Sequence, residues 1–271
     1  MPTLNLSLLG TPRVKQDGHP VEIAARKAVA LLAYLAVTGQ PHSREHLAAL
    51  FWPESDTVHA RGALRSTLIT LRQAIGATWI TSEGDSLALR QSPDCDLDVT
   101  RFRAALAAVR KHLHAPNVFC ADCMAHLVFA ADVYRSDLLT GIGLTDSPAF
   151  DEWLFFEADG LRRDLADVLQ RLAANHAASG SLELGVAAAR RWLALDGLHE
   201  PAHRLLMQFF ALAGQRSAAL RQYDECARIL AAELGAQPSA ETYHQRISIW
   251  ADRFAPLFSH YPVNGQWCPR G

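Results

Sequence analysis

Alternating apolar and polar residues open the chain, and the period then changes to that of a helix. LNLSLLG, which begins at Leu4, alternates and ends at a glycine. TPRVKQ follows, and the Asp-Gly pair of QDGH predicts a tight turn before PVEI. From Ala24 the residues are helix formers, and this helix is predicted to stop at TGQP, where a glycine is followed by a proline. The opening pattern therefore predicts short strands followed by a helix.

Two more helices and a hairpin follow. Ser43 has the position of an N-cap for the short helix REHLAALF, which Pro53 ends. A third helix is predicted to begin at Ser55 or Asp56. Its buried stripe, from residues at helical spacing, is predicted to be Val58, Leu64, Leu68, Leu71 and Ile75. TWITS and SLALR flank EGD and predict a hairpin. This order predicts a winged helix-turn-helix, an α+β DNA-binding domain, over residues 1–93.

The remaining chain predicts helices with few interruptions, and it contains a repeat. GSLELGVAAARRWLALD starts at Gly180 and GQRSAALRQYDECARIL starts at Gly214, an offset of 34 residues. A helix-turn-helix unit of this length is typical of tetratricopeptide repeats. We therefore predict a mainly α protein. Its second domain, residues 94–254, is all-α and tetratricopeptide-like, and residues 255–271 form an irregular tail.

Composition and charge are those of a folded protein with a mild asymmetry. Apolar residues make up 49% of the chain and charged residues 20%. Residues 1–90 contain nine Lys and Arg against seven Asp and Glu, a net charge of +2, whereas the rest of the chain carries −4. This direction favours an N-terminal DNA-facing domain. We find no secretory signal pattern and no apolar stretch of the roughly 18–20 residues that cross a bilayer, so we expect a cytoplasmic protein without a membrane partner.

The third helix carries the candidate DNA contacts. Arg61 and Arg65 are one turn apart, so both can point into a major groove, where arginine reads guanine or binds phosphate. Two arginines on a helix are often only a solvated face, but the helix-turn before them and the hairpin after them favour DNA binding. Further outward-facing candidates on this helix are His59, Ser66, Thr70 and Arg72. Candidates for phosphate contacts near helix N-termini, equally consistent with surface charge, are Arg26, Lys27 and Arg44.

The loop FWPESD between the second and third helices contains Trp52. A tryptophan in this position is more often a core anchor than a contact for a partner. The sequence leaves open a role for Trp52 in contacting a protein such as RNA polymerase.

The order of these parts resembles that of the SARP-type bacterial transcriptional activators, which join an OmpR-like winged helix to a bacterial transcriptional activation domain. The resemblance rests on RKAVALLAYLAVTGQPHSREHLAALFWPE, ARGALRSTLITLRQAI, YRSDLLTGI, FDEWLFFEADGLRRDLADVLQRLAANHAASG and PAHRLLMQFFALAGQRSAALRQYDECARILAAELGAQPSAET. It implies binding to double-stranded promoter DNA, often as side-by-side monomers on direct repeats, and recruitment of RNA polymerase. By position, Arg61, Arg65 and Arg72 match the recognition helix and SEGDS matches the wing. The segment KHLHAPNVFCADC is not a general feature of the family.

That segment, residues 111–123, has the spacing of a metal site. Zinc takes Cys and His ligands in short pairs, and a Cys-x-x-Cys turn directs both sulfurs toward one point. The predicted ligands of a structural Zn²⁺ are His112, His114, Cys120 and Cys123. His126, one turn after Cys123, is the substitute if His112 points away. Alternatives are plain loop residues or a redox Cys-x-x-Cys. The remaining cysteines are Cys95, a weaker candidate, Cys226, read as a core thiol, and Cys268, in the tail.

No enzyme motif is recognisable in the sequence. It lacks a phosphate-binding glycine loop, Gly-x-Ser-x-Gly and His-Glu-x-x-His. The acidic residues of FDEWLFFEAD fit the solvated face of a long helix. We therefore expect a DNA-binding regulator and not an enzyme. The alternative is a repeat-based interaction or ligand-sensor protein whose winged helix is a protein-binding platform.

Overall fold

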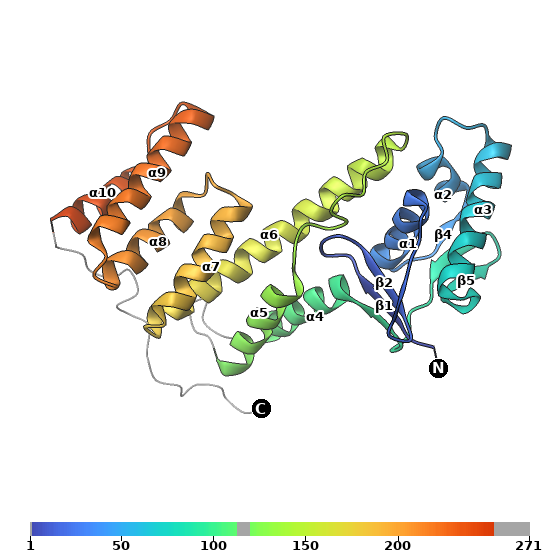
Figure 1. Cartoon of the computed structure of the whole chain (residues 1–271), viewed down its shortest axis with the longest axis horizontal. Helices are drawn as coiled ribbons and strands as arrows, with labels where there is room; N and C mark the ends of the chain where they lie inside the picture. The colour runs from blue at the N-terminus through green and yellow to red at the C-terminus, as the bar shows by residue number, and fades with distance from the viewer. Residues whose placement is uncertain (1, 113–119, 252–271) are drawn as a thin grey trace. The chain divides into compact units, whose positions relative to one another are not determined.

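The chain divides into two compact units. The computed structural model describes residues 2–112 and 120–251 (Figure 1). Unit 1 comprises residues 1–105 and 132–162, and unit 2 comprises residues 106–131 and 163–271. The unit that contains the winged helix is therefore larger than the domain 1–93 drawn from the sequence, because two later segments pack with it. Within the described ranges, no helix is both long and apolar enough to cross a membrane.

A four-stranded sheet opens unit 1, with the order β3-β2-β1-β7. Its strands are β1 (Leu4–Ser7), β2 (Arg13–Gln16), β3 (His19–Val21) and β7 (Cys95–Leu97). Asp17 and Gly18 both have positive φ, so the predicted tight turn joins β2 to β3. β7 pairs with β1 in parallel. The sequence pattern predicted the first three strands and missed β7.

Three helices and a second sheet complete the winged helix, whose fold class is as predicted. The helices are α1 (Arg26–Thr38), α2 (Arg44–Phe51) and α3 (Thr57–Ile75). The Ser43 hydroxyl accepts a hydrogen bond from the His46 N–H, and the Asp56 carboxylate accepts two from the first turn of α3, so both predicted N-caps are confirmed. The second sheet has the order β4-β6-β5 and consists of β4 (His42–Ser43), β6 (Ser86–Leu89) and β5 (Ile80–Glu83), preceded by the 3₁₀ turn η1 (Ala77–Trp79).

The buried stripe of α3 differs from the prediction at one position. The buried residues are Ala60, Leu64, Leu68, Leu71 and Ile75, whereas the predicted Val58 is 79% exposed. Val58 precedes Leu64 by six residues, which at about 100° per residue places it about 120° away from the stripe. Ala60, four residues before Leu64, lies on the stripe instead. The prediction for Val58 is therefore wrong.

Helices account for the rest of the described chain. They are α4 (Asp98–Lys111), α5 (Ala121–Val133), α6 (Pro148–Ala178), α7 (Leu182–Leu195), α8 (Glu200–Leu212), α9 (Arg216–Leu234) and α10 (Ala240–Trp250). Asp98 is 2% exposed, and its carboxylate accepts hydrogen bonds from the backbone N–H groups of Leu8 and Leu9, both at 2.9 Å. This buried carboxylate ties the start of α4 to the chain that leaves β1.

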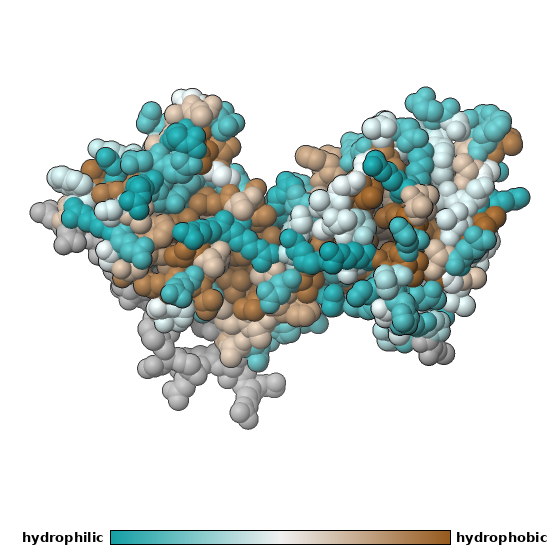
Figure 2. Space-filling view, viewed as in Figure 1, coloured by the Kyte–Doolittle hydropathy of each residue, from teal (hydrophilic) through white to brown (hydrophobic). Residues whose placement is uncertain are grey.

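The last four helices of unit 2 pack on one another. α7 contacts α8, α8 contacts α9 and α10, and α9 contacts α10. Gly180 and Gly214, the matching positions of the 34-residue repeat, have the same φ of 72° in the turns before α7 and α9. Figure 2 shows apolar residues on this face of unit 2 over α7 and α8. The two helix pairs agree with the repeat in the sequence, whereas their assignment as tetratricopeptide repeats stays a prediction.

Replacing Gly185 with alanine is expected to destabilise unit 2 by about 1–3 kcal/mol. A Cβ atom at Gly185, on α7, would lie 2.2 Å from Cε1 of Phe209 on α8. The Phe209 ring is fully buried and cannot move aside without repacking its neighbours. Urea unfolding measures the change. Gly160→Ala is the matched control, since that helical position faces open space and should gain up to about 1 kcal/mol. Equal stability of the two variants would contradict this account of the packing of α7 on α8.

Candidate functional site

The outer face of α3 is exposed along its length. Its buried stripe packs on α1 and α2, so the opposite side faces solvent. The side chain of Arg61 is 55% exposed, and Arg65, Ser66 and Thr70 are also exposed. The predicted DNA-contact residues of this helix, with the exception of Arg72, thus lie where a nucleic acid can reach them.

Apolar side chains share this face with the arginines. Val58 is 79% exposed and Ile69 is 50% exposed. In a recognition helix such groups can contact the methyl group of thymine. The sequence pattern placed Val58 in the core, so it was missed as a surface residue. The four-residue spacing from Ala60 to Leu64 was the signal that could have placed Ala60 on the buried stripe instead.

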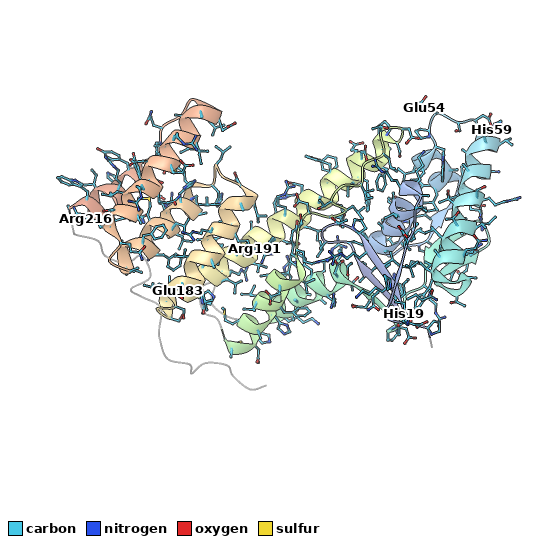
Figure 3. The ribbon with its side chains drawn as sticks, in the orientation of Figure 1. His19, Glu54, His59, Glu183, Arg191 and Arg216 are labelled. Carbon is cyan, nitrogen blue, oxygen red and sulfur yellow. The ribbon has the colours of Figure 1, made fainter. Side chains whose placement is uncertain are left out.

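The charged groups around Arg61 and His59 form only exposed pairs. Nη2 of Arg61 lies 3.9 Å from a carboxylate oxygen of Glu45, and both side chains are exposed. Such a pair contributes little in water, so phosphate can replace the carboxylate. His59 lies at the start of α3 (Figure 3), and its Nδ1 lies 2.6 Å from Oδ2 of Asp56. The His59 backbone N–H, followed by its ring, lowers the pKa of Asp56, so this cap stays ionised near neutral pH.

Lys27 is engaged within unit 1. Its ammonium donates a 2.6 Å hydrogen bond to the carbonyl oxygen of Phe51 and pairs with Asp146 at 2.7 Å. The hydrogen bond that the Lys27 ammonium donates to the Asp146 carboxylate lowers the pKa of Asp146. The ammonium also lies 5.1 Å from the centre of the Trp52 ring, and Trp52 is half-buried. Lys27 and Trp52 therefore hold the α2–α3 connection against α1, and the Lys27 side chain, 19% exposed, is poorly placed for phosphate.

Two other predicted contact residues lie against the hairpin. The guanidinium of Arg72 donates to the Ile80 carbonyl oxygen at 3.3 Å and to the Ser82 hydroxyl at 3.0 Å. The guanidinium of Arg44 donates to the same hydroxyl at 3.3 Å. Arg72 and Arg44 thus connect α3 and α2 to the first strand of the hairpin. Arg26 begins α1 and is exposed.

The hairpin has an acidic tip. β5 and β6 form the predicted hairpin, with Glu83 paired to Ser86, and are joined through Gly84, whose φ of 57° suits glycine. Glu83 and Asp85, on either side of it, are exposed. Carboxylates at this tip repel phosphate, so the positive charge of this surface comes from α3 and not from the end of the wing.

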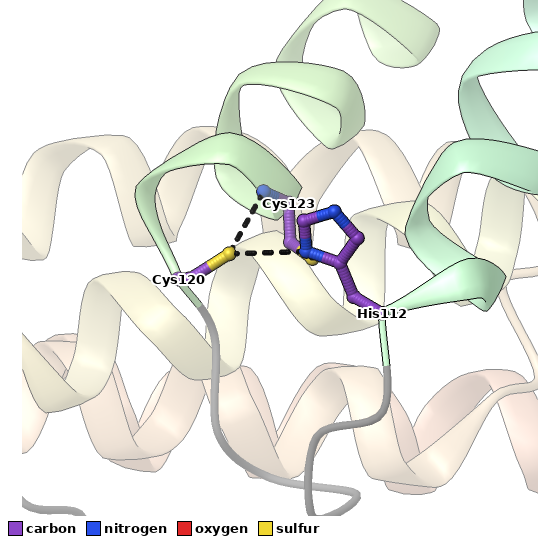
Figure 4. A group of neighbouring side chains, drawn as sticks. All are labelled: His112, Cys120 and Cys123. Carbon is purple, nitrogen blue, oxygen red and sulfur yellow. Dashed lines mark hydrogen bonds between the residues drawn. The ribbon is translucent and has the colours of Figure 1, made fainter. Parts of the chain in front are cut away.

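A second cluster lies between α4 and α5 in unit 2. Nδ1 of His112 lies 3.4 Å from Sγ of Cys120 and 3.3 Å from Sγ of Cys123 (Figure 4). The Cys123 backbone N–H donates to Sγ of Cys120 at 3.5 Å. One donor atom from each residue lies within 4.8 Å of the others, and Cys123 is buried. The structure thus brings together three of the four predicted zinc ligands.

The other metal-ligand candidates fall into two groups. His114 and Cys268 lie outside the described residues. His126, the substitute ligand, and Cys95 are described but do not join the cluster. Cys226 is buried on α9, and burial raises the pKa of its thiol to about 11, as expected for an unreactive core cysteine. Burial also raises the pKa of Cys95.

Residues 97–249 match the bacterial transcriptional activator domain family. The chain belongs to this family. The SARP-type resemblance and the prediction of a transcription regulator in place of an enzyme are thereby confirmed. The match runs from the end of β7 into α10, so the three helices and the hairpin of the winged helix precede it in the chain.

Two further similarities extend the comparison over nearly the whole chain. The regulator is 27% identical over 260 residues to Regulatory protein AfsR of Streptomyces coelicolor, covering 90% of this chain and 24% of AfsR. It therefore spans about a quarter of that relative's length. The structure of Mycobacterium tuberculosis EmbR in complex with a low-affinity phosphopeptide is similar with a TM-score of 0.71, at 21% identity, over 94% of this chain and 67% of that one. The second similarity shows the fold alone.

Proposed function

We propose that this regulator binds promoter DNA in a sequence-specific way, with α3 in the major groove. The observation that carries the proposal is the exposed outer face of α3, where Arg61 and Arg65 stand one turn apart beside Val58 and Ile69. Arginine can bind guanine or phosphate there, and the apolar pair can contact thymine methyl groups. The helix sits in a winged helix-turn-helix, whose geometry presents its third helix to the groove.

The proposed contacts differ in role. Arg61, Arg65 and the neighbouring polar residues Ser66 and Thr70 face outward and are the proposed readers of bases and nearby phosphates. Arg26, exposed at the N-terminus of α1, is a proposed phosphate contact. The remaining predicted residues each have a side-chain partner within unit 1, and their proposed role is to hold α2, α3 and the hairpin in place. They are His59, Arg44, Arg72 and Lys27.

The regulator is further proposed to act as an activator in the cytoplasm, on the bacterial nucleoid. AfsR is named a regulatory protein, and the domain family that this chain matches is named for transcriptional activation. In this proposal α4 to α10 meet RNA polymerase or another protein, and copies of the chain bind side by side on direct repeats.

The salt dependence of duplex binding tests the proposal. We expect measurable affinity for duplex DNA at low salt. The logarithm of the binding constant should fall linearly with the logarithm of the salt concentration, with a slope of about −0.9 for each phosphate contact. A genome-wide binding footprint then supplies the promoter, and affinity for that site should exceed affinity for random duplex by about 10³-fold or more. Duplex binding that is undetectable at low salt would overturn the proposal.

A second candidate function is protein or ligand binding by the helical part. Exposed apolar side chains on α10 favour it, since Tyr243, Ile247 and Trp250 are 47%, 40% and 63% exposed and follow helical spacing. An interaction protein of this kind would bind no duplex in the salt titration. The two candidates are therefore separated by the same measurement.

A further inference from the structure

Three atoms that can bind a metal lie close together between the end of α4 and the start of α5. His112 directly follows α4, Cys120 directly precedes α5, and Cys123 lies in the first turn of α5. The ends of these two helices are therefore adjacent, although seven residues separate His112 from Cys120 in the sequence. His112 and Cys120 are half-buried and Cys123 is buried, so the donors meet at the edge of the core of unit 2.

The two nitrogen–sulfur distances between the donors match those of a tetrahedral zinc site. Zinc binds cysteine sulfur at about 2.3 Å and histidine nitrogen at about 2.0–2.1 Å, which places a sulfur and a nitrogen about 3.5 Å apart at the tetrahedral angle. The two measured distances from Nδ1 of His112 to the cysteine sulfurs are 3.4 and 3.3 Å. Both nitrogen–sulfur distances therefore fit a single ion bound to all three atoms.

Hydrogen bonding alone does not explain this arrangement. An imidazole nitrogen carries either one proton or one lone pair, so Nδ1 of His112 can form one good hydrogen bond in its ring plane. Here two sulfurs approach the same nitrogen at nearly equal distances. A metal ion bound to all three atoms accounts for both approaches at once.

The start of α5 favours the thiolate form that a metal needs. The Cys123 backbone N–H points at Sγ of Cys120, in the manner of an N-cap acceptor at the start of a helix. Such N–H donors and the positive end of the helix dipole stabilise negative charge on sulfur. The Cys-x-x-Cys turn therefore supplies both the direction and the charge of two ligands.

We propose that His112, Cys120 and Cys123 supply three of the four ligands of a structural Zn²⁺ ion in unit 2. Binding breaks two S–H bonds, releases their protons to solvent and forms two Zn–S bonds, while the lone pair of Nδ1 of His112 forms the third bond. The set of two thiolates and an imidazole in tetrahedral geometry suits Zn²⁺ among the common divalent metals. The ion joins the end of α4 to the start of α5, so its role is in the stability of unit 2 and is independent of DNA binding by α3.

Metal analysis of the full chain, purified without chelator, tests the proposal. We expect about one zinc ion per chain in the wild type and loss of most of it in Cys120→Ser and in Cys123→Ser. The matched controls are Cys95→Ser and His126→Asn, which remove a thiol and an imidazole outside the cluster and should retain the zinc. Replacement of zinc by cobalt should give the sulfur-to-cobalt absorption of a thiolate site in the wild type and the controls.

Chelation of the wild type keeps the test independent of whether the cysteine variants fold. We expect the chelator to lower the unfolding temperature by at least several degrees and added zinc to restore it. Wild-type protein that contains no zinc and gains no stability from it would overturn the proposal. So would stoichiometric copper or iron in place of zinc, or a Cys120–Cys123 disulfide, detected as a mass lower by two hydrogens in the peptide that contains both cysteines.

Discussion

Replacing Arg61 and Arg65 together with alanine is expected to lower the affinity of the regulator for its promoter duplex by about 100-fold or more. Each arginine that reads a base or grips a phosphate contributes about 1–3 kcal/mol, and the two losses combine on one face of α3. Fluorescence anisotropy with labelled duplex measures the change. The dependence of affinity on salt should weaken at the same time, by about one unit of slope for each phosphate contact that is lost.

The fold should survive this double substitution. Arg61 and Arg65 are exposed, and Arg61 has only a 3.9 Å exposed pair with Glu45, so the expected change in the free energy of unfolding is within about 0.5 kcal/mol. Arg216 and Arg221 are exposed on α9 in unit 2, and Figure 3 labels the first of them. Their double replacement by alanine removes the same charge and is the matched control. Equal loss of affinity in the two double variants would show that net charge, and not α3, governs binding.

Replacing Asp98 with alanine is expected to destabilise unit 1 by about 2–5 kcal/mol, the largest effect on stability that the structure suggests. The substitution leaves the backbone N–H groups of Leu8 and Leu9 without their acceptor, and both residues are at most 1% exposed. Each orphaned buried donor costs about 1–3 kcal/mol because water cannot replace the lost partner. Thermal and urea unfolding measure the loss.

Asp96→Ala is the control for the Asp98 prediction. Asp96 precedes it by two residues, and its carboxylate contacts the partly exposed Arg101 at 3.2 Å and the side chain of Asn5 at 3.3 Å. A loss of less than about 1 kcal/mol is expected there. Asp98→Asn separates charge from hydrogen bonding, since its single side-chain oxygen can serve one of the two donors well. Comparable stability of the Asp98→Ala and Asp96→Ala proteins would be the contrary result.

Local signals in the sequence predicted most of the fold. Ser43 and Asp56 cap their helices as the side-chain chemistry requires, and the Asp-Gly turn joins its two strands. β4 and β7 were missed because each is only two or three residues long and, unlike the equally short β3, pairs with a strand that is distant in the sequence. Tertiary pairing, and not local pattern, creates these two strands.

For the candidate sites, too, local spacing identified the residues, whereas contacts between distant segments could not be predicted. Arg61 and Arg65 were identified as candidates from their spacing on one helix, and Cys120 and Cys123 from their spacing in one turn. The engagement of Lys27 by Asp146 was beyond the sequence, because the partners are 119 positions apart in the chain. The contact of Arg72 with Ser82 likewise depends on how the hairpin folds back on α3. A pattern identifies which residues share a surface, but it does not identify which of them already have a partner.

The separation of buried and exposed positions on α3 has a consequence for evolution and for engineering. The core side of the helix is set by Ala60, Leu64, Leu68, Leu71 and Ile75, and the outward side contributes little to the packing of unit 1. Substitutions on the outward side can therefore accumulate without loss of the fold. Under the proposed function, changes at these few positions would alter the target sequence, and libraries randomised there should yield stable regulators with altered operators.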